Sequence, residues 1–250
     1  LINNIHNMKK ILILAGMLIL GCRSSPDTSF DNLTEAFISW YFRYHPVESS
    51  RYNMLDNHGE FKTYEVTGRD EYYADISRFL IELSQIDITK ISPNSRVDYN
   101  ILYSRLVKMK HLMEHIRPWE WDPFWTIDEI NDGIYILSER VGFEMDVRVE
   151  SVKSRLEAIP NILFQSKSAM TAHSEIHIAY TNDRIDKLII LLKQLPLMLN
   201  SDNITLDKID FLINKSIKAL QEYKNWLNTD ATKLDKIDFP LDIHLIPASF

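Results

Sequence analysis

Residues 205–227, TLDKIDFLINKSIKALQEYKNWL, decide the fold class of this chain. Apolar side chains recur in this stretch every three or four residues, which is the period of an amphipathic α-helix. They are Leu206, Ile209, Phe211, Leu212, Ile213, Ile217, Leu220, Tyr223, Trp226 and Leu227. Because they cover much of the circumference, the helix needs neighbours on several sides. The stretch therefore predicts one helix of a larger helical domain.

The same period recurs through the rest of the chain. We expect further helices over residues 30–44, 69–86, 92–116, 130–141, 146–170 (kinked or interrupted at Pro160) and 173–198. No alternating strand pattern with a tight-turn dipeptide is present. The prediction is an all-α, irregular multi-helix domain of about seven helices over residues 30–228. Residues 229–250 lose the pattern and are interpreted as an irregular, truncated end.

Residues 117–127, RPWEWDPFWTI, depart from the helical pattern. Two prolines and four large aromatic residues do not suit a helix interior, so we expect an ordered loop. Aromatic loops can form a platform for a sugar or a peptide, and these rings can equally pack the loop onto the helices. The packing role is favoured, and ligand contact is the alternative. The four rings are Trp119, Trp121, Phe124 and Trp125.

The N-terminal stretch has the pattern of a lipoprotein signal peptide over residues 8–22. Met8-Lys9-Lys10 supplies a start and a basic region, and an apolar run over 11–20 leads to Ile19-Leu20-Gly21-Cys22, which fits a lipobox. The run is shorter than the roughly 20 residues of a membrane span. We expect cleavage between Gly21 and Cys22 and acylation of Cys22 by palmitate-type chains. A lipid bilayer is then a partner, and the domain lies outside the cytoplasm in the bacterial cell envelope.

The residues on either side of the signal peptide follow from this interpretation. Residues 1–7 precede the first plausible start methionine and are interpreted as an over-extended reading frame. Residues 23–29 are polar and predict a flexible tether. The chain has one cysteine, so its acylation would leave the domain without a disulfide. The net charge of −7 disfavours nucleic acid as a partner.

Two histidine pairs have helical i, i+4 spacing. His111 and His115, with Glu114, give a His-x-x-Glu-His pattern that could hold zinc. His173 and His177 form the second pair, near an expected helix start. Neither pair has a readable third ligand, so we expect no catalytic residue, metal or cofactor in this chain.

Several motifs together resemble the N-terminal half of a bacterial helical family, domain of unknown function eight-eight-five. The first three are residues 96–102 (RVDYNIL), 117–124 (RPWEWDPF) and 155–160 (RLEAIP). The pattern Phe37-x-x-Trp-Tyr-Phe-x-x-His-Pro-Val and the stretch 219–227 add to the likeness, which covers about residues 30–240. The family is similar to gluzincin-type zinc metallopeptidases, with a His-Glu-x-x-His helix in its second half. This chain contains no His-Glu dipeptide, so zinc is expected only in complete family members.

Three functional hypotheses follow from the sequence. The leading one is a membrane-anchored lipoprotein that forms the non-catalytic N-terminal half of a metallopeptidase-like protein, with a catalytic half or a peptide ligand as partner. The second is an autonomous helical binding lipoprotein of the envelope. The third, a small metalloenzyme that uses His111 and His115, is the least favoured.

The lipobox predicts that Cys22→Ser abolishes acylation and leaves the unprocessed precursor. The thiol of Cys22 is the atom that receives the lipid, and serine does not replace it. Metabolic labelling with a fatty acid measures the outcome, with Ser24→Ala as the control. Equal label in Cys22→Ser and the wild type would contradict the prediction.

Overall fold

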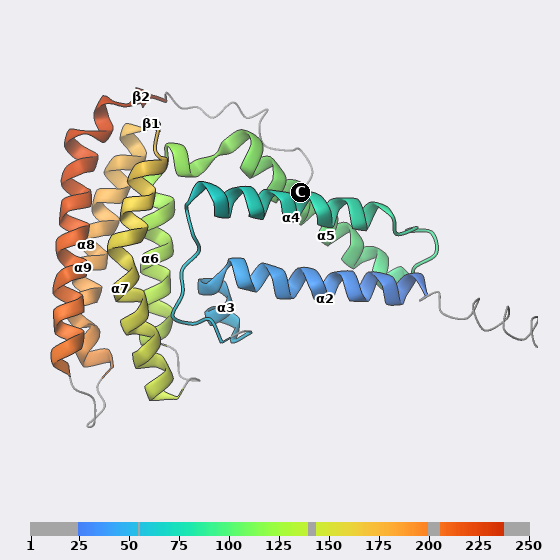
Figure 1. The fold of residues 1–250 in the computed structure, drawn as a ribbon, viewed down its shortest axis with the longest axis horizontal. Coiled ribbons are helices and arrows are strands. Elements are labelled where there is room, and N and C mark those ends of the chain that lie inside the picture. The colour runs from blue at the N-terminus through green and yellow to red at the C-terminus, as the bar shows by residue number, and fades with distance from the viewer. Residues whose placement is uncertain (1–24, 55, 140–143, 200–205, 238–250) are drawn as a thin grey trace, which may run out of the picture.

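The computed structural model describes residues 25–54, 56–139, 144–199 and 206–237. The signal peptide, the lipobox residues Gly21 and Cys22, and residues 238–250 lie outside these described residues. The described residues form eight α-helices, so the all-α prediction is confirmed with one helix more than expected. The helices make two groups that meet at a junction (Figure 1).

The first group is a bundle of four long helices that lie side by side (Figure 1). They are α6 (Pro123–Glu139), α7 (Met145–Ala169), α8 (Glu175–Met198) and α9 (Leu206–Thr229). Each helix packs on two of the others, and Ile130, Leu156, Leu188 and Tyr223 lie fully buried among them. Burial of these side chains supplies the main driving force for the bundle, because each is worth about 1.5–3 kcal/mol.

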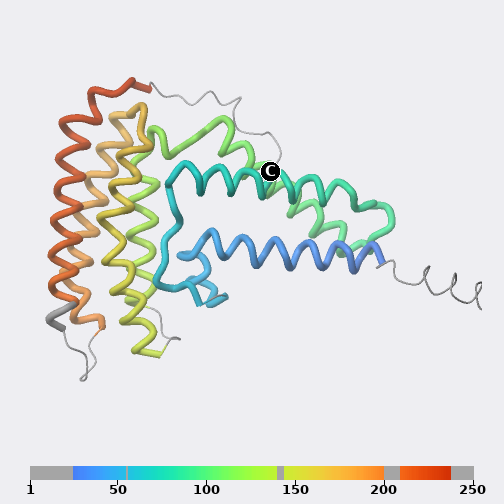
Figure 2. Tube along the Cα trace, in the orientation of Figure 1, coloured from blue at the N-terminus to red at the C-terminus, as the bar shows by residue number. Residues whose placement is uncertain are grey.

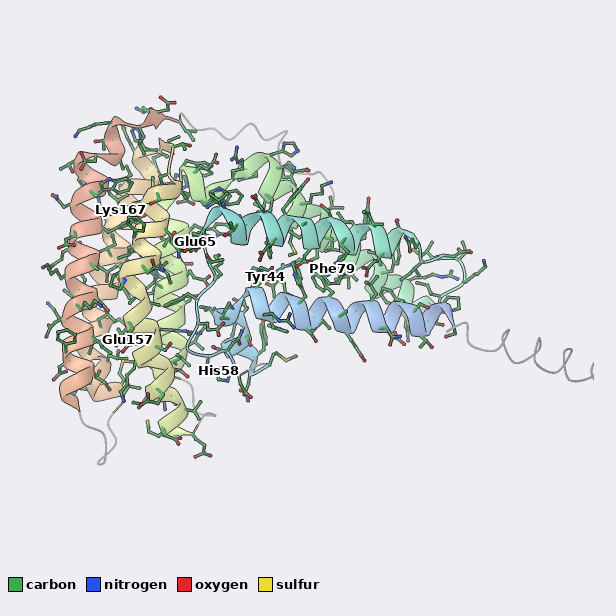
Figure 3. All side chains as sticks on the ribbon, viewed as in Figure 1. Tyr44, His58, Glu65, Phe79, Glu157 and Lys167 are labelled. Carbon is green, nitrogen blue, oxygen red and sulfur yellow. The ribbon has the colours of Figure 1, made fainter. Side chains whose placement is uncertain are left out.

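The second group extends away from the bundle, and we call it the arm (Figure 2). It consists of α2 (Pro26–Tyr44), α4 (Val66–Ser84) and α5 (Pro93–His111). The arm has its own core, formed by Phe30, Leu33, Trp40, Ile76, Phe79, Leu83, Ile91, Leu102, Leu106 and Met109. Figure 3 shows Phe79 between the helices of the arm, where its ring meets Phe37 edge-on at 5.5 Å.

Short elements connect the arm to the bundle. They are α3 (Pro46–Tyr52), a π-helical turn (Leu112–Ile116) and a 3₁₀ turn (Pro118–Glu120). Two strands of two residues, Ala172–His173 and Asp235–Lys236, pair in parallel at one end of the bundle. Neither α3 nor these strands could be predicted from the sequence, because elements this short have no periodicity to detect.

The buried guanidinium of Arg155 holds the junction together. It extends from α7 and donates hydrogen bonds to the carbonyl oxygens of Pro46 at 3.3 Å, Glu60 at 3.2 Å and Gly133. It also donates to Ser50 Oγ at 2.8 Å. Burial lowers the pKa of Arg155 to about 9, so the side chain stays charged at neutral pH. One charged group on α7 thus links this helix to α3, to α6 and to the segment after α3.

Phe61 supports this arginine, and Gly133 makes room for Phe61. The guanidinium carbon of Arg155 lies 5.3 Å from the centroid of the Phe61 ring. A Cβ atom at Gly133 would collide with the same ring. Glycine is unfavourable in a helix interior by roughly 0.5–1 kcal/mol relative to alanine, so the close approach of Phe61 explains its presence in α6.

Three predicted boundaries were wrong. The loop expected over 117–127 ends early, because Pro123 occupies the first turn of α6, where proline is tolerated. The interruption considered at Pro160 is absent, because α7 continues through this residue between the buried Ile159 and Ile162. Helix α2 begins at Pro26, inside the predicted tether over 23–29. Its N-cap is Ser25, whose Oγ accepts a hydrogen bond from the Thr28 amide.

We expect Arg155→Met to lower the free energy of unfolding by about 3 kcal/mol or more. The change leaves several buried carbonyl oxygens without their charged donor. Urea denaturation of a form that begins at Arg23 measures the loss. Arg78→Met is the matched control, since Arg78 is exposed and pairs with Asp75 and Glu82 on the surface of α4; its effect should stay within about 0.5 kcal/mol. Equal effects of the two substitutions would refute a special role for Arg155.

Candidate functional site

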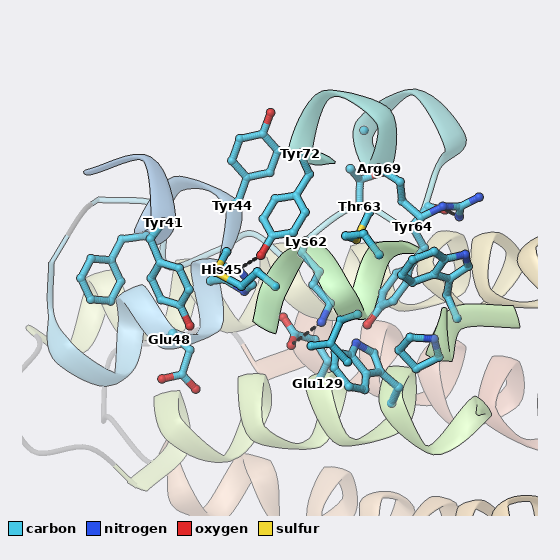
Figure 4. A pocket seen from close by; sticks show the side chains of 18 of the residues that line it. Tyr41, Tyr44, His45, Glu48, Lys62, Thr63, Tyr64, Arg69, Tyr72 and Glu129 are labelled. Atoms are coloured by element: carbon cyan, nitrogen blue, oxygen red, sulfur yellow. Dashed lines mark hydrogen bonds and ion pairs between the residues drawn. The ribbon is translucent and has the colours of Figure 1, made fainter. Parts of the chain in front are cut away.

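A cavity of about 730 Å³ lies at the junction of the arm and the bundle (Figure 4). Its wall combines aromatic rings, four basic side chains and two carboxylates. The aromatic and imidazole rings include Tyr41, Tyr44, His45, Tyr64, Tyr72, Trp119 and Trp125. The charged residues are Lys62, Arg69, Arg105, Lys108, Glu48 and Glu129. These residues come from α2, α3, α4, α5, α6 and the connecting segments, so the cavity depends on the junction.

Lys62 and Glu129 form an ion pair in the cavity. Lys62 Nζ lies 3.5 Å from Glu129 Oε2, and their side chains are only 18% and 16% exposed. The same ammonium group lies 4.8 Å from the centroid of the Trp125 ring and 5.3 Å from that of Tyr64. Lys62 therefore makes cation–π contacts with two rings as well as the ion pair.

Arginines from α4 and α5 add positive charge to the wall. Arg69 lies 5.3 Å from the centroid of the Trp119 ring and donates to the backbone carbonyl of Tyr64. Burial lowers the pKa of Arg69. Arg105 donates to the hydroxyl oxygen of Tyr41 at 2.6 Å. The two guanidinium groups are planar hydrogen-bond donors, and their geometry is suited to binding a carboxylate or a phosphate.

His45 is neutral in this environment. Its Nε2 lies 2.9 Å from the hydroxyl oxygen of Tyr72, and its ring stacks on Tyr41 at 4.2 Å. Burial, followed by the charges of Lys62 and Arg105, lowers the pKa of His45 to about 3. Burial also raises the pKa of Tyr72. The pair therefore contributes hydrogen-bonding groups but no charge at neutral pH.

Two buried polar atoms in the wall, Trp119 Nε1 and Glu129 Oε1, lack a hydrogen-bond partner within the described part of the chain. The first is a donor and the second is an acceptor. A buried polar atom without a partner costs roughly 1–3 kcal/mol, so these two atoms mark a place where a bound group would complete the hydrogen bonding.

The structure separates the four aromatic residues that the sequence had grouped. Trp119 and Trp125 line the cavity, whereas Trp121 and Phe124 do not. Trp121 is buried, donates from Nε1 to the Ile116 carbonyl at 2.8 Å, and meets His177 edge-on at 5.0 Å. Contact of Trp119 and Trp125 with a ligand stays a prediction.

Most of the charged wall was missed by the sequence analysis. Lys62, Arg69 and Glu129 lie in three separate elements, and no short motif joins them. One signal was available, because His45 lies in the Phe37–Val47 stretch that carried the family resemblance. The other wall residues come together only when the arm packs on the bundle.

The histidine pairs do not gather metal ligands. The rings of His111 and His115 lie 4.9 Å apart, but Glu114 accepts a hydrogen bond from Tyr73 and pairs with Lys110 at 3.6 Å. Across the residues that the structure describes, no group of three histidine, cysteine, aspartate or glutamate side chains could hold a metal ion. The expectation of a metal-free chain stays a prediction.

The second histidine pair has local roles. His173 Nδ1 donates to the Leu234 carbonyl at 3.0 Å, which supports the pairing of the two short strands. His177 Nδ1 lies 2.9 Å from Ser174 Oγ at the start of α8. Both contacts are structural.

No family model matches the chain, and no curated protein matches it. A solved structure from Shewanella oneidensis, described as a "putative lipoprotein of unknown function", is similar, with a TM-score of 0.71 and 20% sequence identity. The likeness covers 82% of this chain and 38% of that one, so this chain spans well under half the length of its structural neighbour. At this identity the likeness shows a common fold alone, and the resemblance to domain of unknown function eight-eight-five stays a prediction.

The low pKa of His45 predicts a pH-dependent stability. Folding favours the neutral ring of His45. The contribution of this residue to the free energy of unfolding is therefore fully present above the ordinary histidine pKa of 6.5 and is lost as the pH falls toward 3. At pH 5 the loss should be about 1–2 kcal/mol. Urea denaturation at pH 7.5 and pH 5 should show a smaller loss for His45→Gln, which does not titrate, than for the wild type. His58→Gln is the control, and parallel behaviour of His45→Gln and the wild type would contradict the assignment.

Proposed function

We propose that this chain is the ligand-binding helical domain of a bacterial envelope lipoprotein and that its cavity binds a small organic anion with an apolar or ring-shaped part. The observation that carries the proposal is the cavity itself. Its volume of about 730 Å³ is in the range of small-molecule sites, which is roughly 300–1,000 Å³.

The charges in the wall favour an anion. Four basic residues face two carboxylates, and His45 contributes no charge at neutral pH because of its low pKa. Glu129 already offsets Lys62. Arg69 lies against Trp119, so a carboxylate bound there would meet a cation beside an aromatic surface. The rings supply the apolar area that a ligand's ring or chain would cover.

The unpartnered atoms indicate further groups on the ligand. Trp119 Nε1 would donate to a ligand acceptor such as a carboxylate or carbonyl oxygen. Glu129 Oε1 would accept from a ligand hydroxyl, amide or ammonium group. Uronic acids, aromatic hydroxy acids and short peptides all combine such groups with an anionic end.

The envelope location rests on the lipobox at Ile19–Cys22 and on the description of the structural neighbour as a putative lipoprotein. Within the described ranges, no helix is long and apolar enough to cross a membrane. Acyl chains on Cys22 would anchor the domain stably, since each buried CH₂ contributes about 0.8 kcal/mol and several chains act together.

A second candidate is the non-catalytic N-terminal half of a metallopeptidase-like protein. The neighbour's greater length favours it, because this chain corresponds to 38% of that protein. In such a protein the cavity would form part of a peptide-binding cleft. The DNA downstream of codon 250 tests this candidate: a frame that encodes a His-Glu-x-x-His helix would support it, and a clear intergenic gap would count against it.

The cavity proposal predicts that Trp119→Phe weakens ligand binding about 5- to 20-fold. The change keeps an aromatic ring and removes the indole N–H, a loss of about 1–2 kcal/mol. A panel of uronic acids, aromatic carboxylates and short peptides can be titrated by calorimetry against a form that begins at Arg23. Trp226→Phe is the matched control, because Trp226 also lies beside a basic side chain, with Lys167 Nζ 5.6 Å from its ring centroid, but outside the cavity wall.

The proposal has two clear points of failure. If no anion of the panel binds with a dissociation constant below about 1 mM, the cavity is not an anion site. If ligands bind and both tryptophan variants bind them as the wild type does, the site lies elsewhere on the protein.

A further inference from the structure

The first described residues leave little chain between the acylation site and the folded domain. Ser25 is the N-cap of α2, and Pro26 begins the helix. Only Arg23 and Ser24 separate Ser25 from Cys22. An extended chain spans at most about 3.3–3.6 Å per residue, so Ser25 lies within about 11 Å of the acylated residue.

Helix α2 begins at the end of the arm that is farther from the bundle, and we call this end the tip (Figure 1). The tip consists of residues 25–30 and 86–95. Asp27 Oδ1 accepts a hydrogen bond from the Ser92 amide at 2.9 Å, and Phe30 meets Tyr99 at 6.1 Å. Ser92 also caps α5. The start of α2 is thus fixed to the connection between α4 and α5, and the tip moves with the arm.

We propose that the tip of the arm lies against the surface of the lipid bilayer and that the arm is a rigid spacer between the bilayer and the cavity. This placement rests on the proposed acylation of Cys22, and it specifies in addition how the domain is oriented relative to the bilayer. An α-helix rises 1.5 Å per residue, so the 15 residues from Pro26 to Tyr41 in the cavity wall span about 23 Å along the arm.

The side chains at the tip suit the headgroup layer. Asp87, Thr89 and Lys90 are exposed, and no large apolar side chain of the tip is exposed. Lys90 pairs with Asp87 at 2.9 Å, and its side chain is 68% exposed, so the same ammonium group can also contact lipid phosphates. The tip therefore contacts headgroups without entering the hydrocarbon.

The flanks of the arm are less suited to anionic lipid. Asp31 and Glu35 on α2, and Asp70 and Glu71 on α4, are exposed carboxylates that an anionic surface repels. Val97 and Ile101 on α5 are also exposed, so an arm that lies flat through this apolar flank is the alternative arrangement that an experiment must exclude.

The natively acylated protein in vesicles of phosphatidylethanolamine and phosphatidylglycerol tests the placement. The chain has one cysteine, and acylation blocks it, so a new cysteine gives a single labelling site. Asn94→Cys places a fluorophore at the tip and leaves Lys90 in place, Arg43→Cys places it at the cavity end of α2, and Lys218→Cys places it on the bundle. Energy transfer to an acceptor on the lipid headgroups then reports the distance of each label from the bilayer.

We expect strong transfer at position 94 and at least twofold weaker transfer at positions 43 and 218. A ten-residue Gly-Ser insertion between Arg23 and Ser24 should reduce this difference, because a flexible linker of that length spans roughly 16–19 Å. Equal transfer at positions 94 and 43 would mean that the arm lies flat and would overturn the spacer. Weak transfer at all three positions in vesicle-bound protein would overturn contact of the tip. Failure of every variant, and of the wild type, to bind vesicles would instead reject the acylation of Cys22 and, with it, this placement.

Discussion

The rest of the structure depends on one buried cation. Arg155 places a guanidinium group where the arm, the short helix α3 and the bundle meet, and backbone carbonyl oxygens of Pro46, Glu60 and Gly133 surround it. Each carbonyl would carry a desolvation cost without this donor. A guanidinium group offers five N–H donors in a fixed planar fork, whereas the ammonium group of lysine offers three from a single atom, so arginine suits the four acceptors found here. The two hydrophobic cores are thereby held in one relative position.

That fixed position creates the cavity. The end of α2 delivers Tyr41, Tyr44 and His45, and α3 turns the chain back toward α6 through Pro46, the residue whose carbonyl Arg155 binds. The segment after α3 then carries Phe61 against Arg155 and Lys62 into the cavity. Phe61 thus supports the junction while its neighbour Lys62 lies in the cavity wall. A loosened junction would therefore also displace the positive charge of Lys62.

The sequence specified the long helices well and the junction poorly, for a physical reason. Long amphipathic segments such as 205–227 carry their own periodicity, and burial of the periodic face decides their structure. Pro160 disfavours a helix interior, but α7 continues through it because the residues around it are buried. Pro123 is tolerated in the first turn of a helix and begins α6. The predicted boundaries near both prolines were therefore misplaced. The cavity wall contains residues from elements far apart in the chain, such as Lys62 and Glu129, and no local rule pairs them. Only Trp119, Trp125 and the motif around His45 were accessible from the sequence.

Backbone strain marks the two points where the chain turns into the cavity wall. Among the described residues, Asn53 and Arg117 are the non-glycine residues with positive φ, at 54° and 48°. Asn53 ends α3 before the segment with Lys62, and Arg117 ends the π-helical turn before Trp119. Asparagine tolerates this conformation, whereas for arginine it costs about 1–2 kcal/mol. A straight continuation of α5 would avoid that cost but would carry Trp119 away from Arg69. A left-handed residue is a common way to end a helix, and here it turns the chain so that Trp119 lies in the cavity wall beside Arg69.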